Sequence, residues 1–133
     1  MVTTEHLFDV VERCTRRWDQ RDIEGVLSSY SSGVVYREPG AGIACDGRDA
    51  LRSYLLQYFA TFDSRWIIKE QHRLEGQNAV VAFWEMIVWR PGAPESKLTT
   101  KGMDMLTIVG DEIVSDIVYF DRTQLQPLLK AKA

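Results

Sequence analysis

The first half of the chain places its apolar residues mostly with the spacing of α-helices. In Thr4–Asp19 they recur every three or four positions, which predicts an amphipathic helix with a threonine as its N-cap. Asp22 is expected to cap a short second helix whose apolar stripe runs as far as Tyr30. The same spacing returns in Gly47–Phe62 and predicts a third helix.

Runs of β-branched and aromatic residues fill most of the remaining chain and predict strands. The first strand is expected at Val34–Arg37, closed by a Pro-Gly turn. The second half contains four long runs that are separated by turn sequences: Trp66–Leu74, Ala79–Arg90, Leu98–Val109 and Ile113–Phe120. This succession is typical of antiparallel hairpins. After the last run, Asp121 is expected to cap a short C-terminal helix.

Helices followed by a meander of long strands predict an α+β fold, in which the sheet curves over helices on one of its faces. A sheet that curves around a helix leaves a concave mouth. Concave sites of this kind commonly hold small molecules, so we expect a pocket between the sheet and the helices.

Composition narrows the range of partners. The chain has 133 residues, 45% of them hydrophobic and 26% charged, which predicts one globular domain over residues 1–133. The net charge of −3 and the scattered basic residues argue against a nucleic-acid surface. No apolar run approaches the ~20 residues of a membrane span, and the N-terminus has no signal-peptide pattern. We therefore expect a cytoplasmic protein that contacts neither nucleic acid nor membrane.

Metal and cofactor motifs are absent from the sequence. The two cysteines and two histidines have no metal-ligand spacing, and we predict no disulfide framework, no metal site and no cofactor. The candidate chemistry lies instead in acids. Glu38 stands directly before the Pro-Gly pair in YREPG, and Asp104 interrupts an apolar strand. For each acid the competing interpretation is a solvated surface position, and for Asp104 also a dimer-facing one.

Three segments carry a family pattern: RDIEGVLSSYSSGVVYREPG, GRDALRSYL and GMDMLTIVGDEIVSDIVYFD. With the order of elements, they resemble the nuclear transport factor 2-like superfamily over nearly the whole chain. Within it the pattern is most similar to the ketosteroid isomerase branch and less similar to the polyketide-cyclase-like (SnoaL-like) branch. The resemblance implies a cone-shaped sheet wrapped around three N-terminal helices, an apolar pocket inside it, and a homodimer formed through the outer sheet face.

The resemblance to ketosteroid isomerases also implies a mechanism. In that mechanism a carboxylate base moves a proton beside a ketone, while a tyrosine and a protonated aspartic acid hold the enolate oxygen. By position, Glu38 is the base and Asp104 is the protonated acid. The tyrosine of the first helix falls on Cys14, and a thiol is a weak hydrogen-bond donor compared with a phenol.

A second acid, Asp116, alternates with apolar residues on a strand face that matches pocket positions of the isomerase pattern. Paired strand aspartates are also similar to the epoxide-hydrolase branch, but its arginine two residues before the first acid is Gly102 here, which counts against that chemistry. We predict the following substrate-binding residues: Cys14, Trp18, Tyr30, Tyr54, Tyr58, Trp84, Met86, Asp116 and Phe120.

Three functional hypotheses follow from these residues. The first is an isomerase- or cyclase-type enzyme that binds an apolar carbonyl compound, with Glu38 as general base and Asp104 as donor to the developing oxyanion. The second is a non-catalytic binding or sensing module of the same fold. The third is a dimeric SnoaL-like protein whose pocket has no assigned activity.

Overall fold

In the computed structural model, residues 2–130 are described, and they form helices and strands in an α+β order. The elements are α1 (Thr4–Asp19), α2 (Ile23–Ser28), β1 (Tyr30–Glu38), the 3₁₀ turn η1 (Pro39–Ala41), β2 (Ile43–Asp46), α3 (Arg48–Thr61), β3 (Asp63–Arg73), β4 (Ala79–Arg90), β5 (Ala93–Val109), β6 (Glu112–Phe120), the 3₁₀ turn η2 (Arg122–Leu125) and α4 (Gln126–Lys130).

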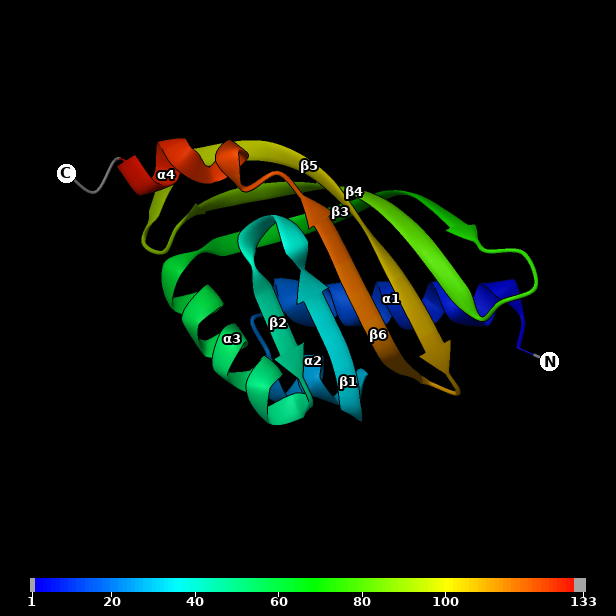
Figure 1. Cartoon of the computed structure of the whole chain (residues 1–133). Coiled ribbons are helices and arrows are strands. Elements are labelled where there is room, and N and C mark those ends of the chain that lie inside the picture. Colours follow the sequence, from blue (N-terminus) through cyan, green and yellow to red (C-terminus); the bar gives the residue numbers. More distant parts are fainter. Residues whose placement is uncertain (1, 131–133) are drawn as a thin grey trace.

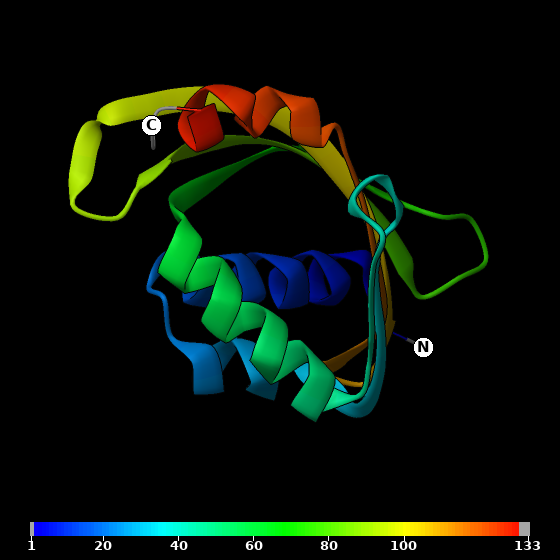
Figure 2. The same ribbon diagram turned by 60° about the vertical axis from the view of Figure 1, so that its left-hand side comes forward.

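The strands form one six-stranded sheet in the order β2-β1-β6-β5-β4-β3. Neighbours are antiparallel except β1 and β6, which run parallel. Register shifts interrupt four of the five pairings, and such irregularities bend strands and strengthen their twist. The sheet accordingly curves over α1 and α3 without closing, which confirms the expected fold class (Figures 1 and 2).

The three predicted helices are present, and α1 and α2 carry the expected caps, whereas α3 begins after Gly47 without a side-chain cap. Thr3 accepts a hydrogen bond from the backbone N–H of His6 at the start of α1, and Asp22 accepts one from Gly25 at the start of α2. The apolar stripe of α1 is buried against the sheet and the other helices. Asp121 caps η2 by accepting from the backbone of Thr123, as the sequence indicated.

Several strand boundaries differ from the prediction; β3, for example, begins at Asp63 instead of Trp66. Tyr30 opens β1 instead of closing α2, because α2 ends at Ser28 and the backbone of Ser29 already pairs with Ile113 of β6. The edge strand β2 was not predicted, since its four residues are too few to show a periodicity. β5 begins at Ala93, because the turn before it needs only two residues.

Arg21 fixes the helices beneath the sheet. Its backbone has a positive φ of 57°, and its guanidinium donates hydrogen bonds to the carbonyls of Phe59 and Phe62 at the end of α3. These carbonyls lack partners within the helix, so the arginine joins the end of α1 to the end of α3. The position of α3 matters because two of its tyrosines enter the pocket described below.

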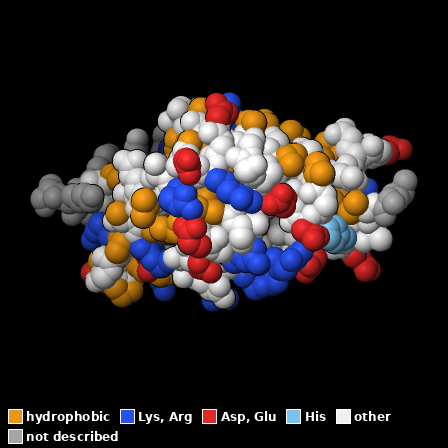
Figure 3. All heavy atoms as spheres, turned by 90° about the horizontal axis from the view of Figure 1, so that it is seen from below, with side chains coloured by type: hydrophobic (Ala, Val, Ile, Leu, Met, Phe, Trp, Pro, Cys, Tyr) orange, Lys and Arg blue, Asp and Glu red, His pale blue; other side chains and the backbone are white. Residues whose placement is uncertain are grey.

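The surface beneath the helices has no single-sign charge. Figure 3 shows acidic and basic side chains interspersed over this face, and several form ion pairs, such as Arg52 with Glu24 and Asp49. Within residues 2–130, every helix is too short or too polar to cross a membrane.

Candidate functional site

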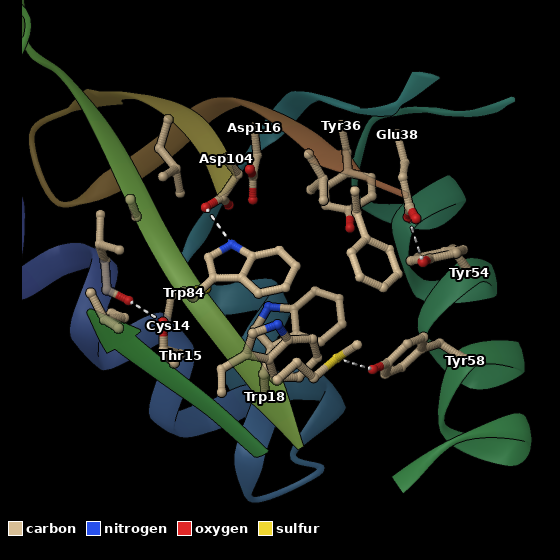
Figure 4. A pocket seen from close by; sticks show the side chains of 18 of the residues that line it. Cys14, Thr15, Trp18, Tyr36, Glu38, Tyr54, Tyr58, Trp84, Asp104 and Asp116 are labelled. Atoms are coloured by element: carbon tan, nitrogen blue, oxygen red, sulfur yellow. Dashed lines mark hydrogen bonds between the residues drawn. The ribbon is translucent and has the colours of Figure 1, made fainter. Parts of the chain in front are cut away.

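A pocket of about 90 Å³ lies between the concave face of the sheet, α1 and α3 (Figure 4). Its walls are largely aromatic: Trp18 packs edge-on against Trp66 and Tyr58, and Trp84 packs against Phe120. The sequence-predicted site residues all line this one pocket: Cys14, Trp18, Tyr30, Glu38, Tyr54, Tyr58, Trp84, Met86, Asp104, Asp116 and Phe120.

Asp104 and Asp116 meet at one end of the pocket. β5 and β6 are antiparallel neighbours, with Asp104 opposite Val118 and Leu106 opposite Asp116. Side chains two residues apart share a face of a strand, so the two acids are diagonal neighbours on the concave face. They lie close enough for a proton on Asp104 to be donated to Asp116, and Figure 4 shows the two carboxyl groups side by side.

The two acids share a site that disfavours two negative charges. Burial raises the pKa of Asp104 well above its usual range, and the charge of Asp116 raises it further. Burial also raises the pKa of Asp116, although hydrogen bonds from Asp104 and Tyr30 act in the opposite direction. Ionisation of both carboxyl groups is energetically unfavourable because the two negative charges would lie so close together. The pair therefore retains one proton, carried by Asp104, at pH values where an exposed aspartate is ionised.

Two uncharged side chains donate hydrogen bonds to this acid pair. The Tyr30 hydroxyl donates to Asp116 Oδ2 at 2.8 Å, and the Trp84 indole Nε1 donates to Asp104 Oδ1 at 3.3 Å. Asp116 Oδ1 is buried and has no hydrogen-bond partner among residues 2–130. The acid pair therefore has one buried oxygen that is free to accept a proton or a hydrogen bond.

Gly102 explains how Trp84 reaches its acid. The two residues are opposite each other on β4 and β5, and the six-membered ring of the indole lies over the glycine. A Cβ on Gly102 would lie 2.4 Å from Cη2 of Trp84, which is closer than real contacts allow. The position that carries an arginine in the epoxide-hydrolase pattern is therefore filled by an indole, and a neutral donor replaces a cation beside Asp104.

Glu38 lies toward the other end of the pocket and is 3% exposed, so the solvated-turn interpretation is wrong. Arg122 donates to both of its oxygens, at 2.7 Å from Nε and 3.2 Å from Nη2. Tyr54 donates to Oε2 at 3.0 Å. The Pro39-Gly40 turn packs tightly against the end of β6, where a Cβ on Gly40 would lie 2.9 Å from the carbonyl oxygen of Phe120. That close approach brings Glu38 to Arg122.

Cys14 lines the pocket and interacts electrostatically with Asp116. Burial, with the charge of Asp116, raises the pKa of its thiol to about 12. The group therefore stays a neutral thiol, and a thiol is a weak donor. The first-helix position thus supplies no strong donor to a ligand oxygen.

Sequence reasoning missed three polar residues of the pocket: Thr15, Tyr36 and Arg122. Tyr36 precedes Glu38 by two positions on β1, so strand alternation alone would have placed it on the same face. Arg122 gave no comparable signal, because it follows the last strand and meets Glu38 across 84 residues of sequence. In the described part of the chain, His, Cys, Asp and Glu side chains form no group of three suited to a metal ion.

Comparisons with known proteins place this geometry among known folds. A family model described as the SnoaL-like domain matches residues 11–116. Searching the curated proteins produced no significant match.

Three solved structures illustrate the similarity. A protein from Catenulispora acidiphila with a ketosteroid isomerase-like fold, in complex with trimethylamine, is 18% identical with a TM-score of 0.76, over 91% of this chain and 89% of that one. TerC, co-crystallised with polyporic acid, is 18% identical with a TM-score of 0.80, over 94% and 98%. An LEH-like epoxide hydrolase from M. tuberculosis is 16% identical with a TM-score of 0.78, over 96% and 83%. At these identities the similarities establish the fold alone.

The contact between Trp84 and Gly102 makes a first prediction. In Gly102→Ala the new methyl group displaces the indole, so the hydrogen bond to Asp104 lengthens or breaks. The indole N–H resonance of Trp84 should then shift in a ¹H–¹⁵N spectrum. Gly33→Ala is the matched control, because no atom lies within 4 Å of a Cβ there. An unchanged indole resonance in Gly102→Ala would contradict the geometry.

The acid pair leads to a second prediction, which concerns how the stability of the folded protein changes with pH. An unfolded aspartate titrates near pH ~3.9, whereas folded Asp104 keeps its proton to higher pH. Between the two pKa values the unfolded chain binds fewer protons than the folded one, so stability falls as pH rises. Asp104→Asn removes this loss. Relative to wild type, it should gain about 1–3 kcal/mol between pH 3 and pH 7 in urea titrations.

The matched control for this measurement is Glu95→Gln, which removes an exposed carboxylate far from the pocket. Its difference from wild type should change little with pH. If Asp104→Asn follows the control instead, the acid pair does not retain a proton in the folded protein.

Proposed function

The chain belongs to the SnoaL-like family, and on this premise we propose that it is an isomerase- or cyclase-type enzyme that moves a proton next to the carbonyl group of an apolar small molecule. One observation supports this most directly: a carboxyl pair that shares a proton at one end of an aromatic pocket. Such a pair contains both a proton donor and a proton acceptor at one place, as acid–base catalysis requires.

The proposed reaction uses the two acids in different roles. Asp116, as carboxylate, takes a proton from the carbon next to the carbonyl. The electrons of that C–H bond form a new C=C bond, and the carbonyl π electrons move to the oxygen. Asp104, as neutral acid, donates its hydrogen bond to that oxygen while negative charge develops there. Return of the proton from Asp116 to another carbon of the conjugated system completes an isomerisation.

Two carboxylates compete for the role of base, and the contacts favour Asp116 over Glu38. Both oxygens of Glu38 accept hydrogen bonds from Arg122, and one accepts a third from Tyr54. Asp116 Oδ1, by contrast, has no hydrogen-bond partner among residues 2–130 and is free to take a proton. Glu38 and Arg122 then serve as a polar anchor for the substrate end that points away from the acid pair.

The dimensions and lining of the pocket indicate the substrate class. A volume of about 90 Å³ suits a single ring or the end of a larger molecule. The tryptophan, tyrosine and phenylalanine walls favour a flat, apolar body. The small molecules bound to the structural relatives, trimethylamine and polyporic acid, are consistent with ligand binding in this fold.

Non-catalytic ligand binding is the alternative function. The absence of a strong donor at Cys14 and the engagement of Glu38 by Arg122 favour it, because two parts of the isomerase pattern are then unavailable for chemistry. A binding module should retain affinity for a carbonyl ligand and show no turnover.

We also propose a homodimer that forms through the outer face of the sheet. Phe83, Met103 and Tyr119 are direct neighbours across β4, β5 and β6 on the face opposite the pocket. Phe83 is 39% exposed and Tyr119 is 48% exposed. A contiguous exposed apolar row on a sheet is typical of a protein interface, and a second copy of the chain offers a self-complementary surface.

The enzyme proposal is tested with cyclohex-3-enone, a small ketone whose double bond can move into conjugation. Wild-type protein should accelerate formation of cyclohex-2-enone, followed by its ultraviolet absorbance. Asp116→Asn should lower the rate about 100-fold or more, since the base is removed. The rate should show a bell-shaped dependence on pH, because one acid must be ionised while the other is protonated.

Glu38→Gln distinguishes the two candidate bases. It should raise KM, because Arg122 loses its partner, while kcat stays within about tenfold of wild type. A loss of kcat in Glu38→Gln as large as that in Asp116→Asn would transfer the base role to Glu38. Binding of the ketone without any turnover by wild-type protein would support the non-catalytic alternative.

The dimer is tested by light scattering after size-exclusion chromatography. Wild-type protein should have twice the mass of the 15.3 kDa chain, and Phe83→Glu should be monomeric, because a charge in the apolar row cannot be desolvated cheaply. Val109→Glu changes a residue that is 65% exposed at the turn between β5 and β6 and should leave the mass unchanged. A monomeric wild-type protein would contradict the proposal.

A further inference from the structure

Four tyrosines line the pocket, and their hydroxyl groups differ in one respect. The hydroxyl of Tyr30 donates to Asp116, that of Tyr54 donates to Glu38, and that of Tyr58 bonds Ser64 and Met86. In residues 2–130 the hydroxyl of Tyr36 has no hydrogen-bond partner. It is therefore the tyrosine hydroxyl of this pocket that is free to bind a ligand.

The position of Tyr36 places this free hydroxyl beside the acid pair. Tyr36 and Asp116 are partners in the parallel pairing of β1 with β6, and both side chains point into the pocket. Asp104 lies on β5, on the other side of Asp116. Three adjacent strands thus present a phenol, a carboxylate and a carboxylic acid in one polar row, and Figure 4 shows the Tyr36 hydroxyl directed into the cavity.

The surroundings of Tyr36 keep it rigid and neutral. Its ring packs edge-on against Tyr30 at 6.4 Å and lies 5.6 Å from the ring of Tyr54, and the residue is only 4% exposed. Burial raises its pKa well above the usual range, and the neighbouring ionisable groups raise it further. A neutral phenol held by its neighbours is a preorganised hydrogen-bond donor.

We propose that Tyr36 is a catalytic residue that donates a hydrogen bond to the same ligand oxygen as Asp104. This inference rests on the proposed function and completes it, because Cys14 supplies no strong donor from the first helix. Two neutral donors from β1 and β5 then hold a developing oxyanion, while Asp116 lies between them on β6 as the base. The ligand recognised there is a carbonyl compound whose oxygen enters the pocket first.

The experiment uses cyclohex-2-enone labelled with ¹³C at its carbonyl carbon, because the carbonyl resonance moves downfield as hydrogen bonds to its oxygen strengthen. Titration into wild-type protein gives both the bound chemical shift and Kd. In Tyr36→Phe the bound resonance should lie upfield of the wild-type value, and Kd should rise about tenfold. With cyclohex-3-enone, kcat should fall about 100-fold.

Two controls separate ligand contact from structural damage. Tyr36→Phe removes a hydroxyl without a partner in the described protein, so its Tm should equal that of wild type. Tyr119→Phe changes an outward-facing tyrosine that is 48% exposed, and it should leave both the bound shift and Kd at wild-type values.

The outcomes distinguish this inference from the proposed function. Equal bound shifts in wild type and Tyr36→Phe, or no binding of the ketone by wild-type protein, overturn the role of Tyr36. A wild-type protein that binds the ketone with the expected Tyr36 dependence but does not isomerise cyclohex-3-enone supports Tyr36 as a ligand donor and overturns the catalytic part of both proposals.

Discussion

The close approach of Asp104 and Asp116 in an apolar pocket is the constraint on which the site depends. Two ionised carboxylates at this distance in a low dielectric would repel each other and lose hydration, so one proton has to remain. Neutral side chains donate hydrogen bonds to the carboxyl oxygens: Tyr30 donates to Asp116, and Trp84 donates to Asp104. Without these donors, buried carboxyl oxygens would lack partners, at a cost in stability.

The second charged centre of the pocket, Glu38, is stabilised by a cation instead of by a retained proton. Glu38 is also buried, but a guanidinium faces it and a phenol adds a further hydrogen bond. One acid site thus limits itself to a single negative charge by retaining a proton, and the other offsets its charge by pairing with a cation. A ligand that spans the pocket meets a proton donor and acceptor at one end and an ion pair at the other. This polarity favours one orientation of a ligand with unlike ends.

Much of this fold follows from local sequence, and the site follows only in part. Helical spacing identified α1 and α3 almost to the residue, because one face of each helix is buried along its length. Alternation left the direction of Asp104 open, and the resemblance to ketosteroid isomerases implied the inward position that Asp104 and Asp116 have in the structure. The short edge strand β2 escaped detection because four residues show no period.

The missed contacts share a physical cause, which is long-range pairing. Nothing near Arg122 in sequence indicates that it meets Glu38, since the contact depends on the curvature of the sheet and on the tight turn at Gly40. Tyr36 differs, because it lies two residues before Glu38 on one strand, so a period of two places the two side chains on the same face. What the sequence does not reveal for Tyr36 is the free hydroxyl, which depends on how the other three tyrosines are engaged.

The contact of the Trp84 indole with Gly102 is another long-range pairing that the sequence does not show. A cation at that position would stabilise the ionised form of Asp104 and release the shared proton, whereas a neutral N–H leaves the proton in place. Glycine at this position therefore does more than remove a charged donor. It makes room for an indole that keeps Asp104 a hydrogen-bond donor. This arrangement favours stabilisation of a developing oxyanion over a permanently ionised acid pair.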